Sequence, residues 1–412
     1  MQAKDDAEGE DGSPQWRRTL TAMAIVQVVM SLSFTFLSPI MPLFLPEIGV
    51  ANDTHLYLWS GALGSVTSFV AALISPVWGR MADRHGRKLM VLRSALAIGI
   101  CTLLMGLAQN VWHLLGARIL MGAFAGFSAA SVILISTQVP RQKLGYALGL
   151  LSSGQLVGSL LGPVFGGALA DLTGSYRLPF FVGGALSLVA AALCWGWVPE
   201  AFTPPKGTKA KMSLKAALRL VGTTPGLAAL VVVLLLAQFA VQAVQPVVAL
   251  YVQAIVGDRP DLATLGGIAL SVTGLAGVVA VPLLSRAGDR FGEKVVLMIA
   301  LAGAALATIP QAATGSYMGF VAERLGLGLF VGSIVPVTNA LIGKISTASD
   351  RGTTFGITSS AYFLGNSFGP MTGGAVAAYA GLPWVFVLTT VLLLAGLAWV
   401  TVAVPRRSGA PQ

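Results

Sequence analysis

Three charged side chains stand well inside long apolar stretches of the sequence, away from their ends: Arg118, Glu323 and Arg324. A charge in hydrocarbon costs at least about 2.5 kcal/mol, so each of them must face a cavity or a partner. Glu323 is the only carboxylate well inside any of these stretches, and a carboxylate in such a place can carry a proton. An ion pair of Glu323 with Arg324 or with Arg118 explains the same residues, and both interpretations stay open here.

Neutral amides occupy similar stretches. Gln238, Gln242 and Gln245 follow one another at spacings of four and three residues, which places them on one face of a helix. Further side chains complete a candidate lining for a neutral, partly aromatic cavity: Gln27, Phe34, Gln155, Asn339 and Asn366. Amides also bridge neighbouring helices in membranes, so a purely structural role is the alternative. The scarcity of buried charge favours ligands that are held by shape and apolar contact.

Groups for covalent or metal chemistry are sparse. The histidines are scattered, and both cysteines, Cys101 and Cys194, lie in apolar stretches. An enzyme needs a nucleophile beside a base, or a metal cluster, and two isolated thiols predict neither a disulfide nor a metal site. The phosphate-binding pattern GxxxxGK[ST] is missing too. The sequence therefore predicts a protein that is not an enzyme, holds no metal or cofactor and does not use ATP directly.

Composition predicts the elements that carry these residues. Of the 412 residues, 55% are hydrophobic and 10% charged, and the mean hydropathy is +0.79. Soluble chains carry about 25% charged residues, whereas about 20 apolar residues in a helix cross the roughly 30 Å of membrane hydrocarbon. Twelve runs have such a length: 20–46, 57–78, 89–109, 111–137, 145–170, 179–198, 227–252, 263–284, 295–314, 316–342, 353–379 and 383–404. We expect an all-α protein with twelve transmembrane helices in a lipid bilayer.

The net charge of +10 is unevenly distributed. Most Lys and Arg residues fall on the tails and on the loops of one side, and the opposite side has only Arg177 and Arg259. The positive-inside rule then predicts that both termini are cytoplasmic. Membrane topology accounts for the positive charge, so no nucleic-acid partner is expected.

The chain divides at its midpoint. We predict a disordered acidic tail at 1–15, a six-helix bundle at 16–198, a cytoplasmic linker at 199–222, a second six-helix bundle at 223–405 and a short tail at 406–412. The first segment lacks the basic-then-apolar order of a signal peptide, and its acidic, polar composition is typical of disorder.

A short basic stretch between the second and third runs occurs twice. Residues 79–88, Gly-Arg-Met-Ala-Asp-Arg-His-Gly-Arg-Lys, have a degraded copy at 285–294, Ser-Arg-Ala-Gly-Asp-Arg-Phe-Gly-Glu-Lys. The two glycines of the first copy predict a tight turn with positive φ. A repeat at half the chain length indicates two related halves. We interpret these residues as a conformational latch, a turn with positive-inside charge being the alternative: Gly79, Asp83, Arg84, Gly86, Arg87, Lys88, Arg93, Asp289 and Arg290.

The fifth run carries a second pattern at fixed spacing. Its members fit G-x8-G-x3-GP-x2-GG: Gly149, Gly158, Gly162, Pro163, Gly166 and Gly167. The eleventh run repeats it: Gly356, Gly365, Gly369, Pro370, Gly373 and Gly374. Small residues let helices pack closely, and proline bends a helix and removes a donor. Both halves should therefore have a bent fifth helix with a glycine face.

Together these patterns resemble the major facilitator superfamily. The 79–88 stretch is similar to its signature between helices 2 and 3, with Met81 where leucine is usual, and Arg118 with Gly122 is similar to its helix 4 pattern. The likeness is greatest to the twelve-helix drug:proton antiporters, the MdtG-type bacterial multidrug exporters, and it is weaker in the second half, where Glu293 replaces Arg87. The resemblance implies two pseudo-symmetric bundles, and it associates the helix 5 pattern with antiport and Arg118 with proton coupling.

The expected function is thus export of hydrophobic or amphiphilic small molecules in exchange for protons, by a monomer of the bacterial inner membrane. Arg118, Glu323 and Arg324 are the candidates for proton coupling. The alternative is an exporter or importer of one defined metabolite, such as a sugar. A receptor-like sensor would normally add a soluble domain, which the sequence lacks.

Overall fold

The computed structural model describes residues 14–199, 221–222, 224, 226–346 and 351–404. For a few helical residues, among them Gly79, Asp83 and Arg84, it describes the backbone alone. Nearly all of the predicted acidic tail, the linker 199–222 and the tail 406–412 lie outside the described residues. Within the described ranges every regular element is a helix, as the sequence predicts.

The N-terminal half starts with α2 (Pro14–Thr35) and α3 (Ile40–Phe44), which together make the first membrane-spanning unit. Pro39 stands directly before α3 and Pro42 lies within it, and proline interrupts the regular hydrogen bonding of a helix,. The rest of this half is built from six helices: α4 (Asp53–His85), α5 (Arg87–Gly106), α6 (Val111–Ala123), α7 (Phe127–Gln138), α8 (Leu144–Thr173) and α9 (Leu178–Trp197).

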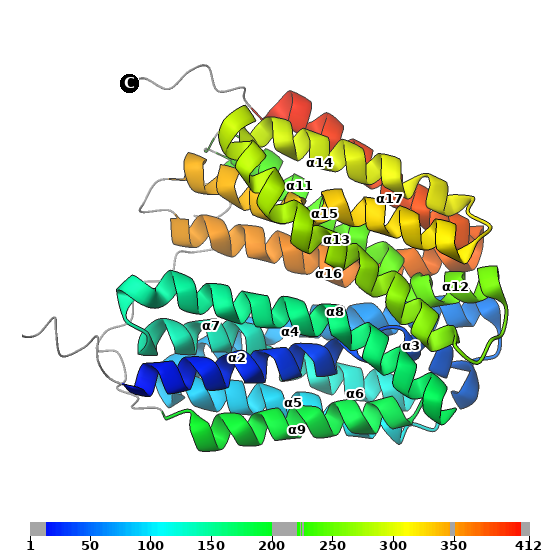
Figure 1. Ribbon diagram of the computed structural model, residues 1–412, viewed down its shortest axis with the longest axis horizontal. Helices are drawn as coiled ribbons and strands as arrows, with labels where there is room; N and C mark the ends of the chain where they lie inside the picture. The colour runs from blue at the N-terminus through cyan, green and yellow to red at the C-terminus, as the bar shows by residue number, and fades with distance from the viewer. Residues whose placement is uncertain (1–13, 200–220, 223, 225, 347–350, 405–412) are drawn as a thin grey trace, which may run out of the picture.

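The C-terminal half repeats this order. Its helices are α11 (Leu227–Val244), α12 (Val248–Val256), α13 (Leu262–Phe291), α14 (Glu293–Thr308), α15 (Tyr317–Ile345), α16 (Arg351–Ala380) and α17 (Leu382–Ala403). Here α11 and α12 share one span, as α2 and α3 do. In Figure 1 the first half, blue to green, lies below the second half, yellow-green to red.

Eleven segments of the described chain are long and apolar enough to cross a membrane. The twelfth helix of the arrangement is α16, which has 30 residues but carries several Ser, Thr and Asn side chains. It packs against α4 and α11, so much of its surface faces protein and tolerates polar groups. The fold is therefore the expected all-α membrane protein of twelve helices.

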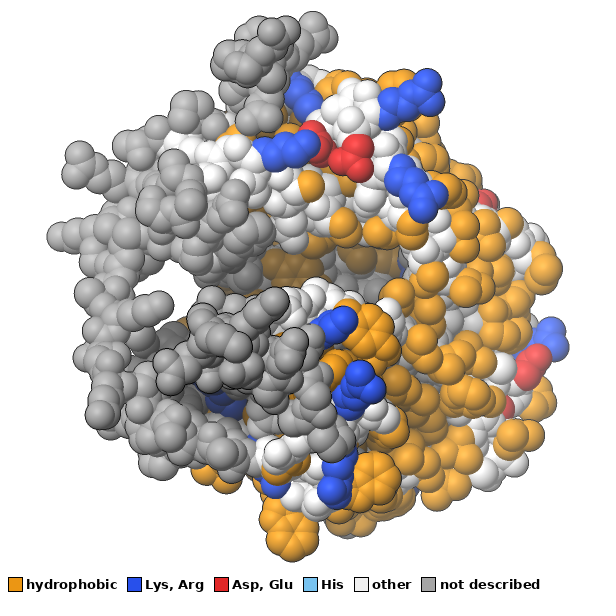
Figure 2. All heavy atoms as spheres, turned by 60° about the vertical axis from the view of Figure 1, so that its left-hand side comes forward, with side chains coloured by type: hydrophobic (Ala, Val, Ile, Leu, Met, Phe, Trp, Pro, Cys, Tyr) orange, Lys and Arg blue, Asp and Glu red, His pale blue; other side chains and the backbone are white. Residues whose placement is uncertain are grey.

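The two halves meet mainly at one end. Hydrogen bonds and close backbone approaches join α4 to α16 and α8 to α13. In both pairs, the N-terminal part of one helix (α4 or α13) meets the C-terminal part of the other (α16 or α8). We call this the closed end. At the opposite, open end the halves diverge, and Figure 2 shows a hollow between them, with hydrophobic side chains inside it and Lys and Arg side chains on the surrounding face.

Candidate functional site

The glycine pattern of α8 is a packing face. A Cβ at Gly158 would come within 2.5 Å of the Val28 carbonyl oxygen, and one at Gly166 would overlap that of Phe36. A Cβ at Gly162 would overlap the Thr35 hydroxyl and come within 2.8 Å of the Leu32 carbonyl oxygen. These three glycines therefore let α8 lie directly on the backbone of α2, and no side chain can replace their hydrogen atoms without moving a helix.

The copy in α16 makes the same contacts on α11. Gly365 meets the backbone of Phe239, with a Cβ distance of 2.9 Å to its nitrogen, and a Cβ at Gly373 would overlap the Ala243 carbonyl oxygen. The first glycines of the two patterns, Gly149 and Gly356, have open space around them. The predicted duplication is thus confirmed in three dimensions, down to the member of the pattern that makes no contact.

The last glycine of each pattern contacts the opposite half. A Cβ at Gly167 on α8 would overlap the Ala263 carbonyl oxygen on α13, and one at Gly374 on α16 would overlap that of Tyr57 on α4. Gly267 on α13 in turn lies against the carbonyl of Pro163. The closed end is therefore formed largely by backbone against backbone.

One carboxylate adds a charged contact at this end. Asp171, in the last turn of α8, accepts hydrogen bonds from the backbone nitrogens of Ala263 at 3.2 Å and Thr264 at 2.7 Å, and from the Thr264 hydroxyl at 2.5 Å. It thus caps the N-terminus of α13 from the other half of the molecule. Asp171 is not among the residues that the sequence predicts for a functional role. A signal existed, because an acid near a helix C-terminus is unfavourable for its own helix.

Next to the closed end, the two halves also touch through single side chains. One turn further along α4, the rings of Phe69 and Phe368 make an edge-to-face contact between the halves, with centroids 6.5 Å apart. On the other side, Leu160 of α8 fills the space beside Gly274 of α13. Phe69 and Phe368 are more than 40% exposed, so their contact leaves part of each ring uncovered.

Two amide pairs join helices within each half. The Gln27 Nε2 donates to the side-chain Oε1 of Gln155 at 3.4 Å, and the Gln238 Nε2 donates to the Asn366 Oδ1 at 2.6 Å. Both pairs join the first and the fifth helix of one half, and 128 residues separate the partners in each. Gly158 contacts Ser31 in the first half, and its counterpart Gly365 contacts Gln238 in the second half, so Gln238 corresponds to Ser31 and not to Gln27. The Gln238–Asn366 pair therefore lies one helical turn nearer the closed end than the Gln27–Gln155 pair.

The other predicted lining residues are placed less tightly. Phe34 is 49% exposed and lies two turns after Gln27 on the same side of α2,. The Cβ of Gln242 lies against Gly369, and Gln245 begins the short turn between α11 and α12. Asn339 is half-buried on α15 and belongs to neither amide pair. The two amide pairs therefore bridge helices, which is the structural role that the sequence left open, while their role in lining the hollow stays a prediction.

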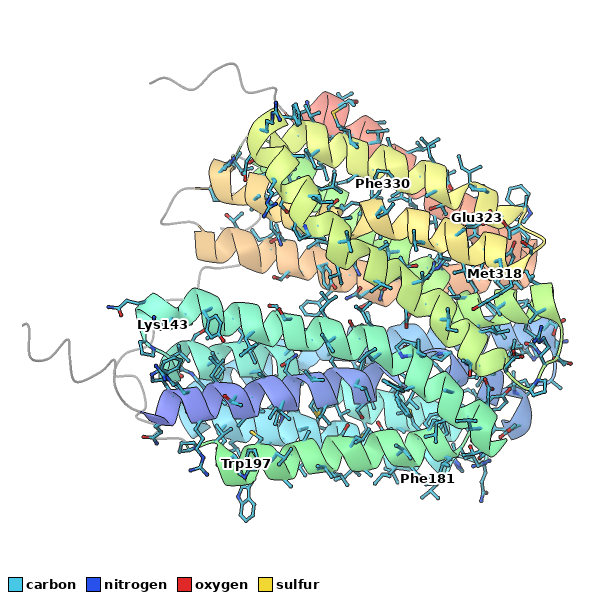
Figure 3. All side chains as sticks on the ribbon, in the orientation of Figure 1. Lys143, Phe181, Trp197, Met318, Glu323 and Phe330 are labelled. Atoms are coloured by element: carbon cyan, nitrogen blue, oxygen red, sulfur yellow. The ribbon has the colours of Figure 1, made fainter. Side chains whose placement is uncertain are left out.

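The buried charges are not paired with one another. The Arg324 Nε donates to the Ala269 carbonyl oxygen at 3.2 Å, and the Glu323 carboxylate accepts from the Thr314 hydroxyl. Neither the Glu323–Arg324 nor the Glu323–Arg118 ion pair forms among the described residues. Successive residues of a helix face different directions, which explains why Glu323 and Arg324 separate. Figure 3 shows Glu323 on α15 towards the end where the halves meet.

Arg118 differs from its counterpart Arg324. Its Nε is buried and has no hydrogen-bond partner among the described residues, although the Thr67 hydroxyl binds its backbone carbonyl at 3.2 Å. The next helical turn packs in the same way in the two halves, since Gly122 lies against the Thr67 carbonyl and Gly328 against that of Thr273.

The 79–88 stretch is mostly helix and not a loop. α4 continues to His85 and α5 begins at Arg87, so the expected tight turn over 79–86 shrinks to Gly86, with φ 93°. Gly79 is helical, which corrects the prediction of a positive φ there. The apolar run ends before the helix does because the polar turns extend beyond the membrane core. In the copy, Gly292 has φ 92° and Asp289 and Arg290 are exposed.

Two basic residues of the predicted latch hold neighbouring helices. The Lys88 ammonium donates to the Trp195 carbonyl oxygen at 2.7 Å, and Lys294 does the same to that of Thr401 at 3.3 Å. Arg93 donates to the carbonyl oxygens of Phe124 and Ala125 at 3.3 and 3.0 Å. The latch role itself depends on Asp83 and Arg84, whose side chains lie outside the described residues, and stays a prediction.

Comparison with known proteins gives consistent results. The Major Facilitator Superfamily model matches residues 23–259 and 230–412. The multidrug resistance protein MdtG of Yersinia enterocolitica is 36% identical over 382 residues, which cover 93% of this chain and 92% of that protein. MdtG of Salmonella typhimurium is 35% identical over 379 residues, covering 92% and 93%.

Among solved structures, a bacterial homologue of the human lysosomal transporter Spinster, in an inward-facing and occupied conformation, is similar in fold. Its TM-score is 0.78 at 19% sequence identity, with 95% of this chain and 97% of that chain covered.

Proposed function

Because the chain belongs to the major facilitator superfamily, we propose that it is a multidrug efflux transporter that exports hydrophobic or amphiphilic small molecules in exchange for protons. It is a multi-pass membrane protein and a transporter, not an enzyme. The observation that carries the proposal is a hollow with hydrophobic side chains inside it, between two halves joined at one end. The exposed Phe69 and Phe368 rings and the two amide pairs are the side chains that we propose to line it. Two curated multidrug resistance proteins that are similar over most of their length support the substrate class.

Alternating access follows from how the closed end is built. Its contacts are glycine and carbonyl surfaces, one capped helix terminus and the hydrogen bond from the Met371 amide to Ser65 at 2.8 Å. None of these contacts interlocks, so rocking of one half against the other can part the halves here and bring them together at the open end. The positive-inside rule supports placing the open end, and both termini, in the cytoplasm of a bacterial inner membrane. A single chain contains both halves, so the working unit we propose is a monomer.

Glu323 is the group we propose to carry the proton, with Arg118 and Arg324 influencing its exchange. One carboxylate oxygen, Oε2, is buried and has no hydrogen-bond partner among the described residues. That oxygen is the atom that would receive the proton. The 79–88 stretch, which contains Asp83, would stabilise the other state of the cycle, in which the two halves meet at what is here the open end.

Transport into inverted membrane vesicles tests the proposal, using cells that lack other drug exporters. We expect energised vesicles to accumulate a fluorescent amphiphilic dye, and collapse of the pH gradient by nigericin to abolish the accumulation. Accumulation that survives nigericin would contradict the antiport. Inhibition by one metabolite, with none by unrelated amphiphiles, would contradict the multidrug part.

The proton carrier is tested by Glu323→Gln in the same vesicles. The amide cannot release a proton, so we expect dye accumulation to lose its pH dependence and to fall at least tenfold. Glu47→Gln, an exposed glutamate at the closed end, is the matched control and should transport like the wild type. An unchanged pH profile in Glu323→Gln would return that residue to a structural role.

A further inference from the structure

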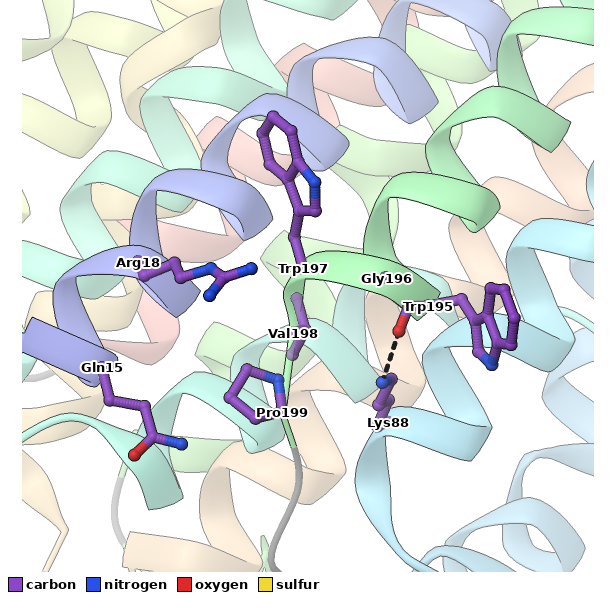
Figure 4. A pocket seen from close by; sticks show the side chains of 8 residues that line it. All are labelled: Gln15, Arg18, Lys88, Trp195, Gly196, Trp197, Val198 and Pro199. Atoms are coloured by element: carbon purple, nitrogen blue, oxygen red, sulfur yellow. Dashed lines mark hydrogen bonds between the residues drawn. The ribbon is translucent and has the colours of Figure 1, made fainter.

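A cavity of about 470 Å³ lies at the open end, on the outside of the N-terminal half. It is formed where the start of α2, the start of α5 and the end of α9 come together, as Figure 4 shows. Its lining consists of Gln15, Arg18, Lys88, Trp195, Gly196, Trp197, Val198 and Pro199. In Figure 3, Trp197 points away from the bundle. The cavity is therefore separate from the hollow between the halves.

Part of this arrangement belongs to the fold. Lys88 donates to the Trp195 carbonyl oxygen at the C-terminus of α9, where a cation is favourable,. The second half repeats the contact, because Lys294 donates to the carbonyl oxygens of Thr401 and Val404 at the end of α17. A lysine in this position is thus explained by helix capping in both halves.

The remaining polar and aromatic lining has no such explanation. At the positions that correspond to Trp195 and Trp197, the second half has Thr401 and Ala403, and the same C-terminus forms without an indole ring at either of these positions. Trp195 and Trp197 are 72% and 49% exposed, so neither ring fills the core. The α2 arginine that lines the cavity, Arg18, has Pro225 as its counterpart in sequence. The second half is therefore an internal control, which shows that these side chains are not needed to build the helices.

Arg18, Trp195 and Trp197 are all residue types that interact with lipid headgroups. Guanidinium groups bind phosphate oxygens in a bidentate manner, and tryptophan rings accumulate at the level of lipid headgroups. Basic pockets between membrane helices bind anionic headgroups, and the volume lies in the range of small-molecule sites. We propose that this cavity binds the phosphate of an anionic glycerophospholipid, with Arg18 as the phosphate ligand and Trp195 and Trp197 flanking the glycerol and upper acyl chains.

Native mass spectrometry of the full-length protein tests the site, with dioleoylphosphatidylglycerol or dioleoylphosphatidylethanolamine added to the detergent. We expect the wild type to retain phosphatidylglycerol in preference to phosphatidylethanolamine. Arg18→Gln should weaken phosphatidylglycerol binding about fivefold, the effect of one cation near an anionic lipid, and Trp197→Ala should weaken it further. The thermal unfolding temperature of each variant shows whether it is folded, and Trp197→Phe replaces the alanine variant if that one unfolds.

Arg17→Gln is the matched control. Arg17 is exposed on the same turn, lies over the Trp16 ring and does not line the cavity. The proposal requires it to bind phosphatidylglycerol within twofold of the wild type. Equal losses in the two arginine variants, or no preference of the wild type for phosphatidylglycerol, would overturn it. Displacement of the lipid by millimolar inorganic phosphate would also overturn it, because the site would then be one for free phosphate.

Discussion

The fourth helix of each half occupies the same place in its bundle, yet only the first is broken. α6 ends at Ala123 and α7 begins at Phe127, with Gly126 at φ 120° between them. In the second half, α15 runs from Tyr317 to Ile345 without interruption, although it contains Pro336. Since the two helices descend from one pattern, the difference must lie in the residues around them.

Two side chains of the first half account for it. A helix that is broken within the membrane has backbone carbonyls without helical hydrogen-bond partners. Other groups must then donate hydrogen bonds to these carbonyls. The Trp78 indole donates to the Ala123 oxygen at 2.6 Å, and Arg93 serves the next two carbonyls while its guanidinium lies 3.5 Å over the Trp78 ring. The corresponding residues of the second half are Leu284 and Ile299, which cannot donate.

Some features are the same in the two halves, and others differ between them. The glycine faces, the lysine caps and the packing of Gly122 and Gly328 are the same in both halves. The polar groups differ between the halves. Arg118 and Arg324 differ in their hydrogen bonding, Arg87 has Glu293 as its counterpart, and the amide pairs lie one turn apart. Shared features thus build the scaffold, and differing ones are the candidates for function.

The largest expected effect separates the two buried arginines. Arg324→Ala should destabilise the protein by about 3 kcal/mol, because it empties a fully buried site and frees the Ala269 carbonyl,. Arg118→Ala removes a charge whose Nε has no partner in the described residues, so it should change stability by less than about 1 kcal/mol while lowering proton-coupled transport at least tenfold. Thermal unfolding in detergent and vesicle transport measure the two. Equal losses of stability would refute the distinction.

A somewhat smaller effect tests the shared scaffold. Gly166→Ala and Gly373→Ala place a methyl group on a carbonyl oxygen, so each should destabilise by about 2 kcal/mol through overpacking. Gly149→Ala and Gly356→Ala point into open space, and alanine is the better helix former, so these should be neutral or slightly stabilising. Thermal unfolding of the four purified variants compares them. A difference between the halves within either pair would show that the scaffold is less symmetric than its contacts.

The smallest effect concerns the closed end. Asp171→Asn removes the charge from the cap on α13 and should weaken closure by about 1 kcal/mol, or roughly fivefold in the ratio of closed to open molecules. Spin labels at Leu172→Cys and Tyr379→Cys report it, as both positions are highly exposed and the native cysteines are buried. Ser65→Ala, which loses only the neutral bond from the Met371 amide, is the control and should shift the distances less. Unchanged distances in Asp171→Asn would show that the cap does not contribute to closure.

Composition and spacing were sufficient to predict much of the fold. The apolar runs predicted the helices, and the two glycine patterns predicted the duplicated faces, because packing of small residues is encoded locally. The α4–α5 turn was predicted too long, since hydropathy marks where the membrane ends and not where the helix ends. Asp171 and the partners of Glu323 escaped prediction because each depends on residues brought close only by tertiary structure. The broken fourth helix escaped for the same reason, as its breaking groups lie on α4 and α5.

The backbone contacts at the closed end have an entropic consequence. When side chains form an interface, closing it fixes their rotamers, at up to about 2 kcal/mol for a long one. Gly61, Gly167, Gly267 and Gly374 have no rotamers to lose. This end can therefore open and close with little change in conformational entropy, so that small differences in ligand or proton binding are enough to decide which state prevails.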